Sequence, residues 1–357
     1  MPWHANVRTV TPYVAGEQPQ QKNIIKLNTN ESPYPPGPAV AAALATLDVA
    51  ALRRYPDPDC GVLARALADY HGLSAEQVFV GVGSDDVLAL AFLTFFNSSK
   101  PILFPDISYS FYDVWAGLYR IPYRTPALDG HFRIVKADYL SANGGIIFPN
   151  PNAPTGILED LDLVEDIVRA NNDSVVIIDE AYIDFGGDSA LPLIKKYDNL
   201  LVVRTFSKSR SLAGLRIGYA MGQAGLIKHL KDAKFATNSY TMNAPALTLG
   251  VAAVEDEAYF KETRAKIIHT REWFAQELIR LGFSFPAPMG NFIFAMHEKT
   301  AAAHIFAALR ERAIYVRYWQ RPRIDNYLRI SIGTDDGMRI LADNLADILE
   351  SKGYFGA

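Results

Sequence analysis

A lysine and an aspartate follow two neighbouring apolar runs, in positions from which both could act on one bound group. Asp179 closes the run at 175–178, and Lys208 lies shortly after the run at 200–203. A lysine amine at the mouth of a sheet can form a Schiff base with an aldehyde cofactor, and a carboxylate can keep a pyridine nitrogen protonated. The pair therefore indicates a pyridoxal 5'-phosphate site.

Three polar residues near this pair could bind other parts of the same cofactor. Tyr182 follows Asp179 closely, where its phenol could hydrogen-bond the ring hydroxyl. Ser207 and Arg216 flank Lys208 and supply a hydroxyl and a permanent charge suited to a phosphate. A loop lysine is usually a solvated charge, and an aspartate after a strand is often a helix N-cap. The prediction therefore depends on the whole group.

Two segments resemble a known family. The segment at 205–220 reads TFSKSRSLAGLRIGYA and the segment at 176–185 reads VIIDEAYIDF. Together they resemble the fold type I aminotransferases, and the chain is most similar to the histidinol-phosphate aminotransferase family. The resemblance extends from Asn6 to Thr334. It implies an enzyme of histidine biosynthesis that exchanges an amino group between histidinol phosphate and 2-oxoglutarate.

A glycine turn before a helix is a second candidate for phosphate binding. Gly83, Ser84 and Asp85 precede the helical stretch at 86–96. Free backbone N–H groups and the positive end of the helix dipole favour an anion there. The motif alone favours an ordinary capped helix, but Ser207 and Arg216 beside Lys208 reverse that preference, because a phosphate site needs several convergent donors.

The resemblance also implies roles that spacing does not single out. Tyr109 lies where the family stacks a ring on the pyridine face, and Tyr55 matches a tyrosine that reaches the phosphate of the partner subunit. A homodimer with shared sites is therefore expected. Arg329 and Arg317 match arginines that bind substrate carboxylate or phosphate, and Tyr13 could add a hydroxyl. Two arginines suit an enzyme that accepts a phosphate and a dicarboxylate in turn.

One position departs from the family pattern. Members usually carry asparagine directly before Pro-Thr-Gly, whereas this chain has Ala153 there, preceded by Asn152. We expect Asn152, a water molecule or Tyr182 alone to hold the ring oxygen instead. Asn30 and Glu31 match another family feature, for which the sequence indicates no chemical role.

Other functions fit parts of the pattern. Tyr318, Trp319, Arg321 and Arg323 could serve an imidazole or a benzene ring, so an aromatic amino acid aminotransferase is the nearest alternative. A pyridoxal-phosphate decarboxylase of a phosphorylated amino acid would use the same cofactor residues. The sensor domain of a transcription regulator is disfavoured, because family-like residues from Asn6 leave no room for a DNA-binding module. A cofactor-free structural protein would not need the clustered polar residues.

The composition favours a cytoplasmic enzyme over a nucleic-acid or membrane protein. The 357 residues carry a net charge of −4, and the basic residues form no long run. The most apolar stretch, 87–96, is far shorter than the roughly 20 residues that span a bilayer, and no secretory signal is visible. The single cysteine, Cys60, excludes an intrachain disulfide. The histidines show no metal-ligand spacing, so we expect no metal site.

Short apolar runs alternate with helical patterns, which predicts an α/β fold with a mainly parallel, doubly wound sheet. Ligands of such sheets bind beyond the carboxyl ends of the strands. The candidate site residues follow these runs, which lie at 78–82, 101–104, 145–148, 175–178 and 200–203.

The pattern changes near 245. A long helical stretch reaches 281, and further strands and a helix follow, as in a smaller α+β domain. We expect a large domain at 28–245. By the family resemblance the first residues pack with the smaller domain, which would then comprise 1–27 and 246–357.

Overall fold

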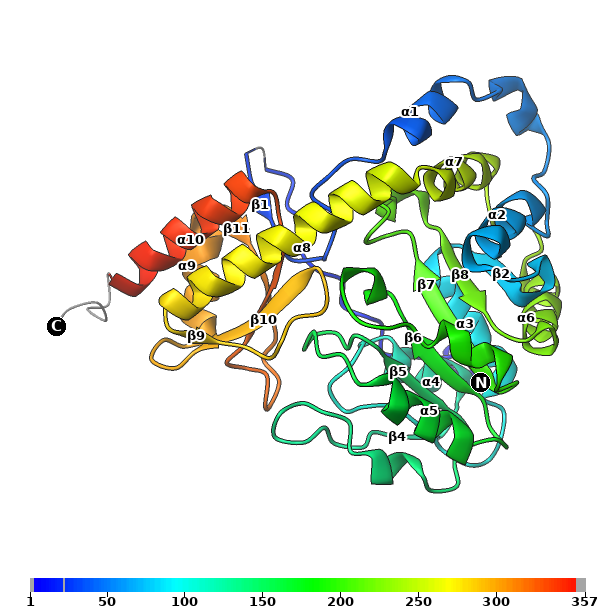
Figure 1. Cartoon of the computed structure of the whole chain (residues 1–357). Helices are drawn as coiled ribbons and strands as arrows, with labels where there is room; N and C mark the ends of the chain where they lie inside the picture. Colours follow the sequence, from blue (N-terminus) through cyan, green and yellow to red (C-terminus); the bar gives the residue numbers. More distant parts are fainter. Residues whose placement is uncertain (1–2, 22, 351–357) are drawn as a thin grey trace.

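A seven-stranded sheet forms the centre of the larger part of the protein (Figure 1). The computed structural model describes residues 3–21 and 23–350. The strands lie in the order β2, β8, β7, β6, β5, β3, β4, and β8 runs antiparallel to both neighbours. The other pairs are parallel, which confirms the predicted α/β fold. The bounds are β2 Val78–Gly81, β3 Ile102–Leu103, β4 Tyr123–Arg124, β5 Ile146–Pro149, β6 Val176–Asp179, β7 Leu200–Thr205 and β8 Gly218–Met221.

Alternate side chains of these strands enter two separate hydrophobic cores, as the two-residue period of a strand requires. Val176 and Ile178 face one core, and Ile177 faces the other. This explains the uninterrupted apolar runs, which are typical of strands buried on both faces. The first core is covered by α1 Pro38–Ala45, α2 Gly61–His71, α5 Leu161–Ala170 and α7 Ala244–Glu255, and the second by α3 Gly83–Phe95, α4 Tyr112–Tyr119 and α6 Ala224–Thr237.

A smaller antiparallel sheet has the order β12, β13, β10, β9 and its own core (Figure 1). Its strands are β9 Phe283–Ser284, β10 Phe292–His297, β12 Arg317–Tyr318 and β13 Leu328–Ser331. Beside it, β1 Ile25–Lys26 pairs in parallel with β11 Ile314–Tyr315. The helices of this part are α8 Glu257–Arg280, α9 Ala302–Glu311 and α10 Asp335–Glu350.

Short 3-10 helices occur in several connections. They are η1 Trp3–Asn6, η2 Val49–Arg53, η3 Ala75–Gln77, η4 Lys136–Tyr139, η5 Ile183–Phe185, η6 Leu191–Lys195 and η7 Ala213–Leu215.

Helices α7 and α8 lie where the chain passes from one core to the other. Leu249 and Val254 of α7 belong to a core of the large sheet, whereas Ile267 and Phe274 of α8 belong to the core of the small sheet. The predicted boundary at 245/246 therefore lies at the start of a helix that packs with α1 and α2. The division into two domains stays a prediction.

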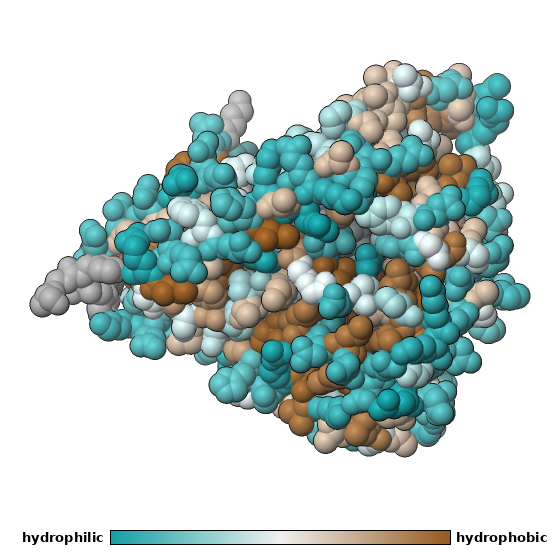
Figure 2. All heavy atoms as spheres, in the orientation of Figure 1, coloured by the Kyte–Doolittle hydropathy of each residue, from teal (hydrophilic) through white to brown (hydrophobic). Residues whose placement is uncertain are grey.

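Large hydrophobic side chains are exposed around α1 and the segment after it. Val49 is 73% exposed and Tyr55 is 81% exposed, and Leu44 and Leu52 are exposed nearby in the sequence. The Tyr55 ring stacks on Tyr240 with the ring centroids 4.6 Å apart. Figure 2 shows hydrophobic residues at this end of the molecule, at the upper right of the view. Exposed apolar patches often mark contacts between protein chains.

The described ranges, 3–21 and 23–350, hold neither a candidate membrane span nor a candidate metal cluster. None of their helices combines the length and the hydropathy that a membrane crossing requires. These ranges also contain no cluster of three or more His, Cys, Asp or Glu side chains placed to hold a metal ion.

Candidate active site

The carboxyl ends of the parallel strands bring most predicted site residues to one cavity of about 220 Å³. Asp179 reaches it from β6, and Lys208 reaches it from the loop after β7. Thr29 and Glu31, from the segment after β1, form another wall. The remaining polar lining residues are Ser84, Asp85, Tyr109, Tyr182, Thr205, Ser207 and Arg216.

Asp179 is a buried carboxylate with two donors. Its Oδ2 accepts from the Tyr112 hydroxyl at 3.0 Å, and its Oδ1 accepts from the Ala181 amide at 3.1 Å. Burial raises the pKa of Asp179 to about 6, against the two hydrogen bonds, and nearby Asp85 and Glu180 raise it further. Without a cation beside it, the ionised form is costly here. The site is therefore built to receive a positively charged group at this carboxylate.

The amine of Lys208 faces the segment after β1. Its Nζ donates to the Thr29 carbonyl at 3.0 Å and lies 5.7 Å from the centroid of the Tyr182 ring. The Tyr182 hydroxyl accepts from Asn30 Nδ2 at 2.9 Å, and Asn30 Oδ1 accepts from the Ser331 hydroxyl at 2.9 Å. Asn30, for which the sequence indicated no role, thus fixes the phenol that lies beside the lysine.

The opposite end of the cavity is the first turn of α3. Arg216 Nη2 donates to Asp85 Oδ2 at 3.2 Å, and the Tyr109 hydroxyl donates to Asp85 Oδ1 at 2.7 Å. Gly83 has φ +84°, and a Cβ at this position would lie 2.5 Å from Arg216 Nη2. Glycine is therefore required for the arginine to approach the start of the helix, where an anion is favoured.

A second cavity of about 80 Å³ adjoins the first and shares Tyr109 and Ala153 with it. Tyr13, Arg317 and Arg329 line it, as predicted for a substrate pocket. Arg317 and Arg329 are register partners on β12 and β13, so both side chains leave the same face of this pair of strands.

Arg329 is the more deeply enclosed of the two arginines. Its Nη2 donates to the Asn28 carbonyl at 2.9 Å, and its guanidinium lies 5.3 Å from the Trp319 ring and 5.5 Å from the Phe292 ring. Its Nε has no hydrogen-bond partner among the residues that the structure describes. Burial lowers the pKa of Arg329, and Arg317 lowers it further. A buried unpaired donor costs about 1–3 kcal/mol, so the pocket favours an anionic ligand.

Three predicted site residues, Gly83, Asn152 and Tyr55, line neither cavity, although Gly83 begins the helix α3 that carries Ser84. Asn152 donates through Nδ2 to the Ile107 carbonyl and to Thr155 Oγ1, both at 3.0 Å, so its amide nitrogen is engaged away from the cavity and Ala153 lines the wall instead. The role of Asn152 as a cofactor ligand stays a prediction. Tyr55 lies at the surface on Tyr240, away from the site of its own chain.

The comparisons with known proteins agree with this geometry. The sequence model for aminotransferase class I and II matches residues 22–345. The chain belongs to this family. It is 51% identical over 352 residues to histidinol-phosphate aminotransferase of Lactococcus lactis subsp. cremoris, with 99% of each chain covered. It is 53% identical over 350 residues to histidinol-phosphate aminotransferase 1 of Hydrogenovibrio crunogenus, with 98% of each covered.

The fold agrees as well. The crystal structure of histidinol-phosphate aminotransferase from Sinorhizobium meliloti in complex with pyridoxal-5'-phosphate has a TM-score of 0.84 to this chain at 24% identity, covering 92% of this chain and 91% of that one. The predictions of an aminotransferase and of its fold are confirmed.

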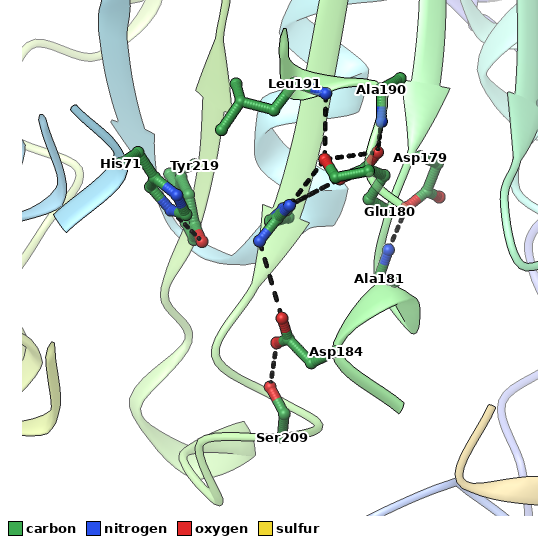
Figure 3. Close-up of polar contacts among 11 residues, drawn as sticks. His71, Asp179, Glu180, Ala181, Asp184, Ala190, Leu191, Ser209 and Tyr219 are labelled. Carbon is green, nitrogen blue, oxygen red and sulfur yellow. Dashed lines mark hydrogen bonds and ion pairs between the residues drawn. The ribbon is translucent and has the colours of Figure 1, made fainter. Parts of the chain in front are cut away.

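A buried ion pair braces the strand ends of this aminotransferase. Glu180, which follows Asp179, lies 2.9 Å from Arg204 of β7 and also accepts from the Ser189 hydroxyl and the Ala190 amide. Figure 3 shows Asp179 and Glu180 pointing to different sides of the end of β6. Burial acts to lower the pKa of Arg204, but Glu180 raises it above its ordinary value. The pair therefore ties β6 to β7 as an ionised unit.

The same network continues toward the lysine loop, because Arg204 Nη1 also lies 3.6 Å from Asp184 Oδ1, and a separate contact joins α2 to β8. The Ser209 hydroxyl, next to Lys208, donates to Asp184 (Figure 3). His71 Nε2 lies 3.1 Å from the Tyr219 hydroxyl. Burial lowers the pKa of His71 to about 3 and raises that of Tyr219 to about 12. Both rings are therefore neutral at physiological pH.

Sequence reasoning did not single out Tyr112, Thr205 or Glu180. Tyr112 lies three residues after Tyr109, a spacing that places two side chains on one helical face, but many tyrosines of this chain have comparable positions. Thr205 stands within the segment that carried the family resemblance, and its hydroxyl lies 3.0 Å from that of Ser207.

Proposed function

We propose that this chain is a pyridoxal 5'-phosphate-dependent aminotransferase that exchanges an amino group between histidinol phosphate and 2-oxoglutarate. The observation that carries this proposal is one cavity that holds an amine, a buried carboxylate and a cation, from Lys208, Asp179 and Arg216. The adjoining cavity adds two arginines. The relatives at 51% and 53% identity bear the name of that activity.

The first cavity fits the phosphate of this cofactor. Arg216, Ser207 and the first turn of α3 at Gly83 and Ser84 would bind it, because they combine a fixed charge, a hydroxyl and free backbone N–H groups. Asp85 would orient Arg216 through their 3.2 Å contact rather than touch the phosphate, since the carboxylate and the phosphate are both anionic.

The cavity also fits the pyridine ring. Tyr109 would lie against the ring, Asp179 would hold the proton on its nitrogen, and Tyr182 would face its oxygen. When bound, pyridoxal phosphate supplies a protonated ring that withdraws electrons from the α-carbon of the substrate. Lys208 Nζ would bind the cofactor covalently in the resting enzyme and, once displaced by the substrate amine, move the proton at that α-carbon.

The second cavity would bind the substrate. Arg329 would pair with the α-carboxylate of glutamate or 2-oxoglutarate through two parallel hydrogen bonds, and Arg317 with Tyr13 would bind the phosphate of histidinol phosphate. Glutamate and 2-oxoglutarate would present a second carboxylate to Arg317 in the other half-reaction. One pocket thus serves both amino donor and oxo-acid acceptor.

An aromatic amino acid is the second candidate substrate. Trp319 lines the second cavity, and the Tyr13 ring at its edge stacks on Phe111 with the centroids 4.1 Å apart. A panel of amino donors with 2-oxoglutarate as acceptor, comparing histidinol phosphate with phenylalanine and tyrosine, decides between them.

Assembly, location and domain division are further parts of the proposal. The exposed Tyr55 and the apolar surface around α1 support a homodimer in which Tyr55 reaches the phosphate site of the partner subunit. The core of the small sheet is separate from the two cores of the large sheet. This supports a large domain and a smaller one that includes the N-terminal arm, with the boundary near the start of α8 instead of the predicted 245/246. The cytoplasmic location stays a prediction.

Titration with pyridoxal phosphate tests the proposed function. Wild-type protein should become yellow, and borohydride followed by peptide mass spectrometry should place the cofactor on Lys208. Lys208→Ala should still bind the cofactor but lose transamination. Full activity of that variant would overturn the proposal.

A further inference from the structure

The loop at 319–327 joins the two strands that carry the pocket arginines, yet it packs on the other part of the molecule. Ile324 is 2% exposed and belongs to a core of the seven-stranded sheet. The Tyr327 ring stacks on Phe294 at 4.4 Å with the planes 7° apart, and it meets the edge of Phe132. Since Phe294 belongs to β10, the loop packs on the small sheet through Tyr327 and on a core of the seven-stranded sheet through Ile324 and Phe132.

Arg323 supplies most polar contacts of this anchor. Its Nη1 donates to Asp106 Oδ2 at 2.8 Å, and its Nη2 donates to the carbonyls of Leu128 and Asp129 at 2.7 and 2.8 Å. Its guanidinium lies 5.7 Å from the centroid of Phe132. Arg323 does not line either cavity.

Asp106 connects this anchor to the cofactor side of the site. Its Oδ1 accepts from the Leu128 amide at 2.9 Å, and its carbonyl accepts from Arg321 Nη2 at 2.6 Å. It lies in the loop after β3 that also carries Tyr109. Tyr109 lines both cavities. Asp106, which binds Arg323, therefore belongs to the same loop as the tyrosine that separates the two cavities.

The strand that carries Arg317 has little support of its own. Strand β12 has two residues and pairs with β13 through Arg317 and Tyr318 alone. The other hydrogen bonds of Arg317 go to the carbonyls of Val14 and Ala15 in the N-terminal arm, at 3.2 and 3.5 Å. So short an edge strand depends on the segments that flank it, here the buried Val316 on one side and the loop at 319–327 on the other.

We propose that Arg323 is a positioning residue for the substrate. By holding the loop at 319–327 on Asp106, it sets the distance of Arg317 and Arg329 from Tyr109 and the cofactor side. This inference rests on the proposed function. We therefore expect loss of Arg323 to weaken the binding of substrates with anionic groups and to leave the binding of the cofactor unchanged.

The test compares Arg323→Gln and Arg323→Lys with the control Arg133→Gln. Arg133 is well matched, because it also donates to one carboxylate, Glu159 at 3.0 Å, and to a backbone carbonyl, Leu158 at 2.9 Å, within the larger part of the molecule. Each protein is loaded with pyridoxal phosphate. KM and kcat with 2-oxoglutarate, the Kd of the cofactor, and calorimetric binding of 2-oxoglutarate without an amino donor are measured.

Arg323→Gln should raise KM and the calorimetric Kd for 2-oxoglutarate by about tenfold, with kcat changed less than about threefold, because small displacements of binding groups are costly. Arg323→Lys should show a smaller loss than Arg323→Gln, because the ammonium keeps the charge beside Asp106 but cannot make all three hydrogen bonds of the guanidinium. Arg133→Gln should leave both values unchanged.

Unchanged 2-oxoglutarate binding in Arg323→Gln, or an equal change in Arg133→Gln, would overturn the inference. A weakened cofactor Kd without a change in 2-oxoglutarate binding would also contradict it. Failure of the proposed function gives a different result, namely wild-type protein that forms no adduct at Lys208. The calorimetric titration still decides the role of Arg323 in that case, because it needs no turnover.

Discussion

The hydroxyl of Tyr112 donates to Asp179 Oδ2 at 3.0 Å, inside the protein, where Tyr112 has no exposed surface. This contact acts to lower the pKa of a carboxyl that burial raises. The tyrosine on α4 therefore supports the charge that the proposed mechanism requires on β6.

Tyr112→Phe should reduce kcat/KM by roughly tenfold to a hundredfold, because a hydrogen bond to a charged group contributes about 1.5–3 kcal/mol. The pKa of Asp179 should rise further, which moves the acid limb of the kcat/KM profile to higher pH. Tyr139→Phe is the control, since the Tyr139 hydroxyl is buried without a hydrogen-bond partner among the described residues. Equal losses in both variants would show that Tyr112 acts only in packing.

Asp179 should make the cofactor-free protein less stable as the pH rises. Its folded-state pKa of about 6 lies above the ordinary 3.8, so the folded state binds more protons than the unfolded state between these values, and ionisation costs stability. Relative to Asp179→Asn, the wild type should lose on the order of 2 kcal/mol between pH 4 and pH 6. Urea unfolding of both proteins across this range measures the difference.

The comparison with Asp179→Asn is needed because His71 acts in the opposite direction. Its folded-state pKa of about 3 lies below the ordinary 6.5, so it removes stability as the pH falls through the same window. A difference between wild type and Asp179→Asn that does not change with pH would contradict the prediction.

Mixed dimers should reveal whether Tyr55 serves the partner subunit. Lys208→Ala and Tyr55→Phe should each be impaired, but a hybrid dimer would contain one site with both native residues. Refolding them together in equal amounts should restore about a quarter of the wild-type activity, since about half the dimers are hybrids with one intact site. If Tyr55 acts in its own chain, no activity returns on mixing.

Arg317 and Arg329 should separate the candidate substrates. Arg317→Ala should weaken the half-reaction of histidinol phosphate by about 2–3 kcal/mol, roughly thirtyfold to over a hundredfold, through loss of a charge-assisted contact. Phenylalanine has no phosphate and should be affected mainly by Arg329→Ala. Single-turnover kinetics with each donor measures both effects. A nearly neutral Arg317→Ala, with phenylalanine the better substrate of the unmutated enzyme, would favour the aromatic aminotransferase.

The sequence predicted the central strands and the residues at their ends because both depend on local pattern. The runs at 175–178 and 200–203 are apolar throughout, and polar side chains after such strands meet at one edge of the sheet. Strand β8, Gly218–Met221, was not predicted. Its four residues, GYAM, include no β-branched side chain and begin with glycine, so strand propensity is weak there, and its place is fixed by pairing with β2 and β7.

Side-chain partners were harder to predict than backbone positions. Asn152 stands at the expected turn, but its Nδ2 donates to the Ile107 carbonyl and to Thr155, and its Oδ1 is buried without a hydrogen-bond partner among the described residues. Asn30 contacts Tyr182 across 152 residues of sequence, and Arg323 contacts Asp106 across 217. Such contacts depend on how distant segments pack, which spacing does not encode.

Arg317 and Arg329 lie opposite each other in the pairing of β12 with β13. Both guanidinium groups can bind one substrate only while this register is kept. Successive side chains of a strand alternate between its faces, so a slip of one residue in this pairing would turn one guanidinium away from the other. The register thus keeps the two guanidinium groups on one face, whereas the loop between the strands sets their distance from Tyr109. A single insertion within either strand would leave both arginines in the chain but separate them on opposite sides of the sheet.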